Sequence, residues 1–203
     1  METEFTGHRG FAWFWSHAVK YEGQREREKR QEVAAPVRGR ALELGVGVGT
    51  NWQYLDPGVD YVGIEPDPYM RQRALENAKE DGRGFEVIDA VAEELPFNDA
   101  EFDTVFTTLT FCSVQQPQKA LAEVMRVLKS GGEFRFFEHV LPDNRVLAPL
   151  FETITPAWKR IGGGCHPNRR TLQRINRAGF HVIGLDRDRV GPIPFVTGVA
   201  RKP

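Results

Sequence analysis

The chain has 203 residues, of which 40% are hydrophobic, and it carries 27 Lys and Arg residues against 28 Asp and Glu residues. This balance argues against a dedicated nucleic-acid-binding protein, for which a strong basic excess is expected. The two cysteines, Cys112 and Cys165, are too few for a disulfide framework. No apolar stretch approaches the roughly 20 residues of a membrane span. The first ten residues also lack the apolar core of a signal peptide.

These limits predict one cytoplasmic domain over residues 1–203, in which residues 1–38 form a helical cap. Aromatic side chains crowd residues 11–21, and residues 24–32 alternate in charge (QREREKRQE). The charge run is expected to be a solvated helix face, supported by pairs four residues apart such as Glu26 with Arg30. The aromatic stretch is expected to pack on the core, to close a pocket, or to touch a membrane surface.

From residue 40 the chain alternates between short apolar runs and helical patterns. Apolar side chains recur with helical spacing over residues 68–78 and 117–128, and two glycines at 131–132 are expected to end the second helix. Such alternation predicts an α/β fold, a doubly wound, Rossmann-like and mostly parallel sheet of seven strands. The first five strands are expected at 41–44, 61–64, 85–88, 104–107 and 133–137.

The pattern changes after residue 140. Residues 141–178 contain a loop and helices and are longer than a plain connection, so they are expected to form an insertion beside a substrate pocket. Two further apolar runs follow, GFHVIGLDRD at 179–188 and PFVTGVARK at 194–202. They are expected to form an antiparallel hairpin at one edge of the sheet.

A glycine loop follows the first predicted strand, in ALELGVGVGTN at 41–51. Ligands of doubly wound sheets bind at the carboxyl ends of the strands, so this loop is a candidate ligand site. It lacks the G-K-[ST] ending of a phosphate-binding P-loop, and Thr50 stands where a dinucleotide fingerprint has its third glycine. Glu43, just before the loop, works against an anionic pyrophosphate and favours a ligand that carries an ammonium and a sulfonium. A plain tight turn and another nucleotide, such as NAD, remain alternatives.

The sequence ELGVGVG at 43–49, followed by EPD at 65–67, resembles the first motif and its successor in class I S-adenosylmethionine-dependent methyltransferases. The resemblance continues in order through residues 90–105, 106–114 and 120–140. It implies S-adenosylmethionine as the cofactor, with Glu65 on the ribose hydroxyls and Ala92 and Glu93 beside the adenine. Val91 replaces the usual acid of this motif, which puts a carboxylate bond to the adenine amine in doubt. The cofactor-binding residues implied are Glu43, Gly45, Val46, Gly47, Gly49, Asn51, Glu65, Pro66, Ala92, Glu93, Thr107, Thr108 and Leu109.

A narrower resemblance covers residues 38–200. CSVQ at 112–115, EHV at 138–140 and WKRIGGGC at 158–165 are similar to the methyltransferase-like thiol S-methyltransferases, which methylate small alkyl thiols. The resemblance implies a small-molecule thiol acceptor. Those proteins carry an N-terminal membrane anchor, which this sequence is expected to lack; an interfacial helix at its start would give peripheral membrane contact. The expected substrate pocket consists of Trp15, Tyr21, Cys112, Trp158 and Cys165.

Methylation of a thiol requires loss of the thiol proton, because the thiolate is the nucleophile. His139, at the end of the fifth predicted strand, and His166, beside Cys165, are the candidate catalytic residues. The alternatives are a hydrogen-bonded histidine at a strand end and a plain loop histidine. No metal is expected, because two cysteines and scattered histidines lack zinc-site spacing. A quinone or phospholipid headgroup acceptor, and a cofactor-binding protein without turnover, remain open.

Overall fold

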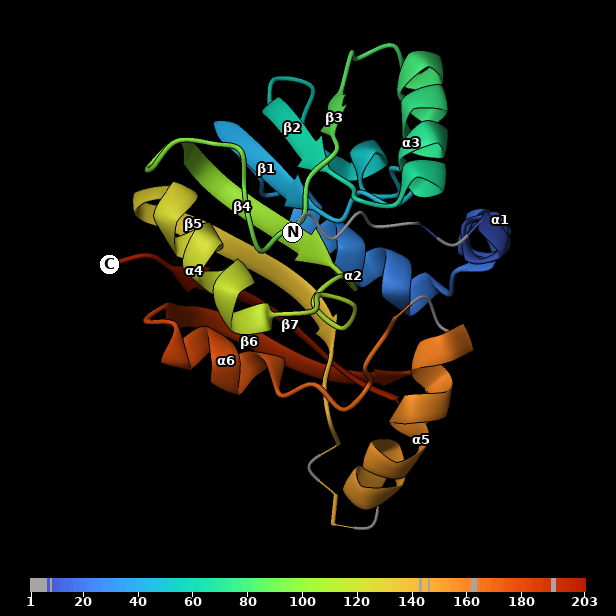
Figure 1. Ribbon diagram of the computed structural model, residues 1–203. Helices are drawn as coiled ribbons and strands as arrows, with labels where there is room; N and C mark the ends of the chain where they lie inside the picture. Colours follow the sequence, from blue (N-terminus) through green and yellow to red (C-terminus); the bar gives the residue numbers. More distant parts are fainter. Residues whose placement is uncertain (1–6, 8, 143, 146, 162–163, 191–192) are drawn as a thin grey trace.

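The fold is built on a seven-stranded sheet with the strand order β3-β2-β1-β4-β5-β7-β6. Figure 1 shows the computed structural model, which describes residue 7 and residues 9–142, 144–145, 147–161, 164–190 and 193–203. The first five strands run parallel, whereas β7 is antiparallel to both β5 and β6. The predicted fold class is therefore confirmed, including the edge hairpin. The strands are β1 (Arg40–Leu44), β2 (Asp60–Ile64), β3 (Glu86–Ile88), β4 (Phe102–Thr108), β5 (Leu128–His139), β6 (His181–Val190) and β7 (Ile193–Arg201).

Two hydrophobic clusters cover the two faces of the sheet, because successive side chains of a strand point to opposite faces. Leu42 and Leu44 of β1 belong to the cluster that also contains residues of α4 and α6. Ala41 belongs to the other cluster, which contains residues of α2 and α3. The helices are α1 (Arg9–Ala18), α2 (Gln24–Ala34), α3 (Pro68–Asp81), α4 (Pro117–Val127), α5 (Leu147–Ile161) and α6 (Thr171–Arg177), with short 3-10 turns η1 (Val19–Tyr21) and η2 (Trp52–Tyr54).

The predicted boundaries differ from the observed ones by a few residues. Helix α3 continues to Asp81 and ends at Gly82, whose φ of 77° is the left-handed conformation that favours glycine at a helix end. Helix α4 ends at Val127, before the glycines that were expected to stop it, and β5 begins directly at Leu128. The early start of β5 accompanies a register shift between Phe102 and Thr104 in its pairing with β4.

The charged helix α2 is not a fully solvated element, which corrects the expectation for this segment. Arg30 is only 3% exposed, and its Nε donates to Glu22 at 2.7 Å rather than pairing with Glu26. Val33 and Ala34 of the same helix are buried against the sheet. Arg30 lies three and four residues before them, so all three share one helix face.

Helices α1 and α5 lie beyond the carboxyl ends of the parallel strands (Figure 1). The proposed division of the chain, with a cap over residues 1–38 and an insertion over 141–178, remains a prediction. Residues 1–6 and 8 of the first range, and 143, 146, 162 and 163 of the second, lie outside the described residues. Across the described ranges, no helix combines the length and hydrophobicity needed to cross a membrane.

Candidate cofactor and acceptor site

The three glycines of the loop after β1 all have positive φ, at 68° for Gly45, 61° for Gly47 and 83° for Gly49. A Cβ atom on Gly45 would lie 2.4 Å from the Cγ2 atom of Thr110, and one on Gly49 would lie 2.5 Å from the ring of Trp52. A Cβ atom on Gly47 would meet no heavy atom within 4 Å. Packing therefore excludes side chains at two of the glycines, whereas the middle one faces open space.

Glu65, directly after β2, ties the glycine loop to the neighbouring strand. Its Oε2 accepts the backbone N–H of Gly47 at 2.8 Å, and its Oε1 accepts that of Asp67 at 3.0 Å. The carboxyl group is buried, and burial raises its pKa to about 7, although the two backbone donors oppose this shift. Glu65 is thus a buried, oriented acid at the carboxyl end of β2, in the position expected from the sequence.

Glu43 supports the same loop from within β1. Its Oε1 accepts from the Nδ2 of Asn51 and its Oε2 accepts from the hydroxyl of Tyr61, both at 2.6 Å. The Nε1 of Trp52 donates in turn to the Tyr61 hydroxyl at 2.8 Å. Glu43 is 1% exposed, and burial raises its pKa to about 7. Both of its oxygens are used to hold the residues around the glycine loop.

Arg30 is a site residue that the sequence reasoning missed. Its NH1 donates to the Oδ1 of Asn51 at 3.3 Å and to the hydroxyl of Thr108 at the end of β4. A signal was present, because Arg30 occupies the same apolar helix face as Val33 and Ala34. A buried arginine on that face, paired with Glu22, brings a cation next to the glycine loop.

The segment after β3, expected beside the adenine, is held to α4 by polar contacts. Ala92 is buried in the core, and Glu93 accepts the backbone N–H groups of Gln115 and Gln116 at 2.8 and 2.9 Å. The Glu93 carboxylate therefore fixes the start of α4. Val91, which replaces the usual acid, is 37% exposed.

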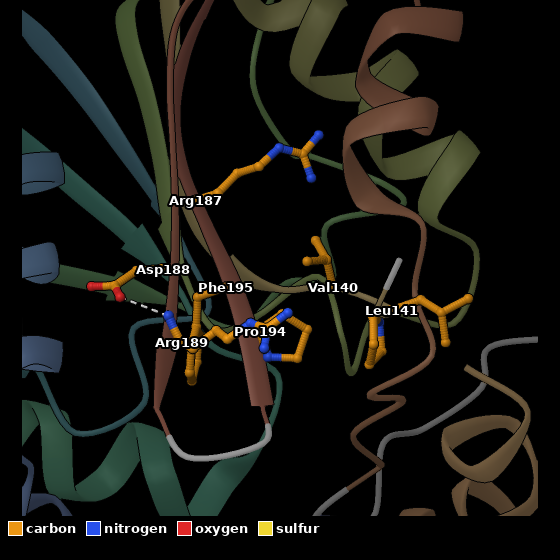
Figure 2. Close-up of a pocket in the computed structure, with 8 residues that line it drawn as sticks. Val140, Leu141, Arg187, Asp188, Arg189, Pro194 and Phe195 are labelled. Atoms are coloured by element: carbon orange, nitrogen blue, oxygen red, sulfur yellow. Dashed lines mark hydrogen bonds between the residues drawn. The ribbon is translucent and has the colours of Figure 1, made fainter. Parts of the chain in front are cut away.

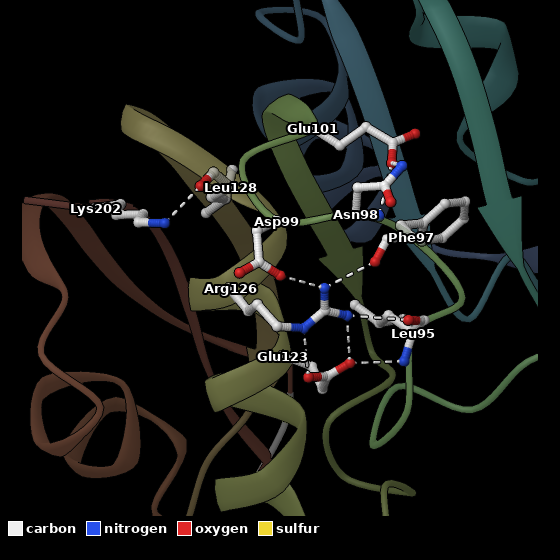
Figure 3. Close-up of polar contacts among 9 residues, drawn as sticks. All are labelled: Leu95, Phe97, Asn98, Asp99, Glu101, Glu123, Arg126, Leu128 and Lys202. Atoms are coloured by element: carbon white, nitrogen blue, oxygen red, sulfur yellow. Dashed lines mark hydrogen bonds and ion pairs between the residues drawn. The ribbon is translucent and has the colours of Figure 1, made fainter.

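Arg126 and Glu123 of α4 secure the continuation of this segment (Figure 3). Arg126 donates to the carbonyl oxygens of Leu95 and Phe97 at 3.0 and 2.7 Å, and Glu123 accepts the backbone N–H of Leu95 at 2.8 Å. These contacts fix the path of the chain between β3 and β4.

The end of β4 has an unusual backbone. Thr107 and Thr108 are buried, and Leu109 has a φ of 59°, a left-handed conformation that costs a non-glycine residue about 1–2 kcal/mol. The N–H of Leu109 donates to the carbonyl of Phe137 in β5 at 2.7 Å. Backbone strain of this kind is often found at functional sites.

Glu138, a buried acid near the end of β5, is the second site residue that sequence reasoning left out, after Arg30. Its Oε1 accepts the backbone N–H groups of Thr110 and Phe111 at 2.9 and 3.1 Å. Its Oε2 has no hydrogen-bond partner among the described residues, and burial raises its pKa to about 7. An acid within the apolar run FRFFEHV was the available signal, since a buried carboxylate needs donors to hold it.

Cys112, His139 and Cys165 meet at the carboxyl ends of β4 and β5. One sulfur or ring nitrogen atom from each lies within 4.8 Å of the others, and the Sγ of Cys165 is 3.9 Å from the Nδ1 of His139. A hydrogen bond from Cys112, with weaker ones from His139 and Trp158, lowers the pKa of Cys165. The fold thus brings together Cys112, His139, Cys165 and Trp158, four residues that the sequence assigned to catalysis or to the acceptor pocket.

The other three predicted residues of this part of the site are His166, Trp15 and Tyr21. His166 binds the carbonyl of Cys112 through its backbone N–H at 2.8 Å and through its Nδ1 at 3.0 Å. Trp15 packs against the cluster that contains Val48 of the glycine loop. Tyr21 is 87% exposed, so the fold does not enclose it in a pocket.

Comparison with known proteins supports a single interpretation of this arrangement. A family model described as methyltransferase domain matches residues 42–136. Thiol S-methyltransferase TMT1B of Rattus norvegicus is 38% identical over 160 residues, and the match covers 76% of this chain and 64% of that protein. Phosphatidylethanolamine N-methyltransferase of Cereibacter sphaeroides is 33% identical over 147 residues, covering 69% of this chain and 71% of that protein.

This chain belongs to the class I S-adenosylmethionine-dependent methyltransferases. Its fold agrees with that of a solved geranyl diphosphate methyltransferase in complex with S-adenosylmethionine, with a TM-score of 0.69 at 12% identity over 93% of this chain and 90% of that one. The chain spans about two thirds of the length of TMT1B.

Two cavities of this methyltransferase lie beside β5 on the side of the hairpin, away from the glycine loop. One of about 360 Å³ is open to solvent and is lined by the residues after β5 and by residues of β6 and β7 (Figure 2). The other, of about 270 Å³, shares Arg187 and Val140 with it. Phe195 lines the first cavity, and the centroid of its ring lies 4.6 Å from that of His139. The side chain of Phe195 therefore lies between this cavity and the group formed by Cys112, His139 and Cys165.

Proposed function

We propose that this methyltransferase transfers a methyl group from S-adenosylmethionine to the sulfur of a small-molecule thiol. The observation that carries the proposal is the meeting of the His139 imidazole with Cys112 and Cys165 at the carboxyl ends of β4 and β5, beside the glycine loop. This edge of the sheet is where α/β proteins bind ligands. The similarity to the thiol S-methyltransferase of Rattus norvegicus supports the same acceptor class.

The residues at the ends of β1 and β2 fit the cofactor, which supplies an electrophilic methyl carbon on a positively charged sulfur. Gly47 leaves open space beside the loop, so backbone can approach a ligand there. Each oxygen of Glu65 accepts one backbone N–H and keeps capacity to accept a ribose hydroxyl. Glu43 holds Asn51 and gives this region a negative charge once ionised, which suits a ligand with an ammonium and a sulfonium.

Further contacts of the cofactor are assigned by their positions. Arg30 brings a cation to Asn51 and Thr108, and this suits the carboxylate of the methionine part. Pro66 and Ala92 are proposed contacts of the adenine, with the exposed Val91 as a proposed apolar neighbour. Gly45, Val46, Gly49, Thr107 and Leu109 remain proposed cofactor contacts, as does Glu93 beside the adenine.

Removal of the acceptor's proton is the chemical requirement that the protein must meet, because alignment of the reacting atoms supplies much of the remaining acceleration. His139 can serve in two ways. Its imidazole can take the proton as a general base, which is the role expected from the sequence. It can also hold a metal ion that lowers the pKa of the acceptor thiol.

The test is methyl transfer from S-adenosylmethionine labelled in its methyl group to a panel of small thiols, compared with lipid extracts. We expect a labelled thioether and an equal amount of S-adenosylhomocysteine. The His139→Asn variant should lose most of this transfer, whereas the exposed His181→Asn control should keep it. Label found only in the lipid fraction would overturn the thiol assignment.

A phospholipid headgroup, or a quinone that partitions into the same membrane, is the second candidate acceptor. Trp13 and Phe14 of α1 are 59% and 58% exposed, and such aromatic side chains suit an interfacial helix at a membrane surface. The similarity to phosphatidylethanolamine N-methyltransferase points the same way. Vesicle binding that disappears in a Trp13→Ser, Phe14→Ser double variant, together with labelled lipid, would favour this candidate.

A cofactor-binding protein without turnover is the remaining alternative. Calorimetry would then show S-adenosylmethionine binding, while no acceptor would yield S-adenosylhomocysteine. The two free cysteines suit a reducing compartment, so a cytoplasmic location is part of the proposal.

A further inference from the structure

We propose that Cys112, His139 and Cys165 bind a Zn²⁺ ion whose fourth coordination position receives the acceptor thiol. This inference rests on the proposed function for the identity of the acceptor, but not for the metal. The three ligand atoms already lie within 4.8 Å of one another. Zinc binds sulfur at about 2.3 Å and nitrogen at about 2.0–2.1 Å in tetrahedral sites, which places neighbouring ligand atoms roughly 3.5 Å apart. The 3.9 Å between the Sγ of Cys165 and the Nδ1 of His139 is close to this separation.

Each ligand comes from an element that its own contacts hold in place. Glu138 fixes the turn that carries Cys112, because it accepts the N–H groups of the two residues before it. His166 anchors the neighbouring Cys165 by binding the carbonyl of Cys112. His139 ends β5, where it pairs with Phe195 of β7. Such support favours a metal site, because ligand side chains that hydrogen bonds already hold in place lose less conformational entropy when the metal binds.

The ligand set selects the metal. Two thiolates and an imidazole are soft or borderline ligands that suit zinc, and the cluster offers no carboxylate oxygen for a hard cation such as Mg²⁺. Two thiolates also neutralise the charge of a divalent ion at a place where Cys112 is only 3% exposed. Three protein ligands with one open position are typical of catalytic zinc, whereas structural zinc sites have four.

The open position explains how a thiol would become a nucleophile at neutral pH. Coordination to zinc deprotonates a thiol, and the proton passes to solvent. The acceptor's sulfur then uses one electron pair to form the new carbon–sulfur bond, while the electrons of the broken bond return to the sulfonium sulfur as S-adenosylhomocysteine forms. The thioether product has no negative charge and binds zinc weakly, so it leaves. In this arrangement His139 is a ligand rather than a proton acceptor.

The experiment uses the full chain, purified without chelators and with a phosphine rather than a thiol as reductant. We expect close to one zinc per chain by elemental analysis. Replacement by Co²⁺ should produce sulfur-to-cobalt charge-transfer absorption and the visible bands of a tetrahedral site. Cys112→Ser, Cys165→Ser and His139→Asn should each weaken Co²⁺ binding by at least about 100-fold, whereas His181→Asn should not change it.

If the variants fail to fold, a measurement on the unmodified protein still tests the metal site. A mercurial that titrates both thiols should release zinc in proportion, as detected by a colorimetric chelator. Two free thiols without bound zinc and without a Co²⁺ spectrum would overturn the metal site. A mass lower by two hydrogens and no free thiol would also overturn it, in favour of a disulfide between Cys112 and Cys165.

The experiments test the metal site and the proposed methyl transfer independently of each other. A small alkanethiol added to the Co²⁺ protein should shift the charge-transfer band, and this readout needs no methyl transfer. A shifted band without any labelled thioether would leave the metal site standing and refute the thiol methyltransferase activity. Undiminished thiol methylation by the metal-free protein would refute the role of the metal and leave the activity intact.

Discussion

Arg30 of α2 donates a hydrogen bond to the hydroxyl of Thr108 at the end of β4, across 78 positions of the chain. The same guanidinium donates to Asn51 beside the glycine loop and to Glu22 before α2. One side chain therefore ties the N-terminal helices to the edge of the sheet where the cofactor is proposed to bind. The position of these helices and the shape of the site are coupled through it.

Replacement of Arg30 should destabilise the protein more than any exposed charge of the same helix. Arg30→Met keeps the length of the side chain but leaves Glu22, only 10% exposed, without its cation, and breaking a buried pair costs about 3 kcal/mol. Urea unfolding should show this loss. Arg25→Met is the matched control, because Arg25 is 68% exposed and its removal should cost at most about 0.5 kcal/mol. Equal losses in the two variants would contradict the structural role of Arg30.

Gly47→Ala should reduce cofactor binding beyond its effect on stability. The positive φ of Gly47 makes any side chain cost about 1–2 kcal/mol of stability, and the added methyl group would point into the open space beside the loop. Gly82→Ala is matched, since Gly82 has a φ of 77° and also faces open space, but at the end of α3. Both variants should unfold at lower urea, and calorimetry should find weaker S-adenosylmethionine binding only for Gly47→Ala. Unimpaired binding in that variant would remove the loop from the cofactor site.

Glu65→Ala should weaken S-adenosylmethionine binding by about 1–3 kcal/mol, the cost of buried hydrogen bonds left unmade. Part of the loss arises because the N–H of Gly47 also loses its acceptor. Glu94→Ala is the control, since the Glu94 side chain is 85% exposed. Calorimetry of the folded variants decides the matter, and an unchanged dissociation constant for Glu65→Ala would refute the ribose assignment.

Stability of the cofactor-free protein should decrease as the pH rises from about 5 to about 7. Burial raises the pKa values of Glu43, Glu65 and Glu138 to about 7, above the value of 4.5 for an exposed glutamate. The folded state then binds more protons than the unfolded state in this window, so the free energy of unfolding decreases with pH, by about 3 kcal/mol for one isolated group with these two values. Above about pH 8 the contribution should be constant.

Urea unfolding at several pH values measures this slope. Glu43→Gln removes one of the three titrations, keeps an acceptor for Asn51 and should make the curve between pH 5 and 7 less steep. Glu94→Gln should leave the slope unchanged. A slope of opposite sign, or one that Glu43→Gln does not alter, would show that these acids remain ionised when buried.

The elements of the sheet could be predicted because their signals are local. Parallel strands such as β1 and β4 are buried on both faces and therefore appear as short apolar runs, and α4 shows its buried face through helical spacing. Local patterns do not give the boundaries of a strand where its pairing with a neighbour decides them. The start of β5 at Leu128 depends on its pairing with β4, and the residues of β5 alone do not specify that pairing.

The sequence by itself determined the fold class, the glycine loop with its two acids, and membership in the methyltransferase family, because these depend on residue order over short stretches. Only the tertiary structure decided which distant side chains meet. Arg30 becomes buried when α2 packs on the sheet, and Cys112, His139 and Cys165 converge because two strand ends and the segment after α5 lie against one another. Spacing along the chain argued against a zinc site, yet ligand geometry depends on distances in space, which the packing of these segments sets.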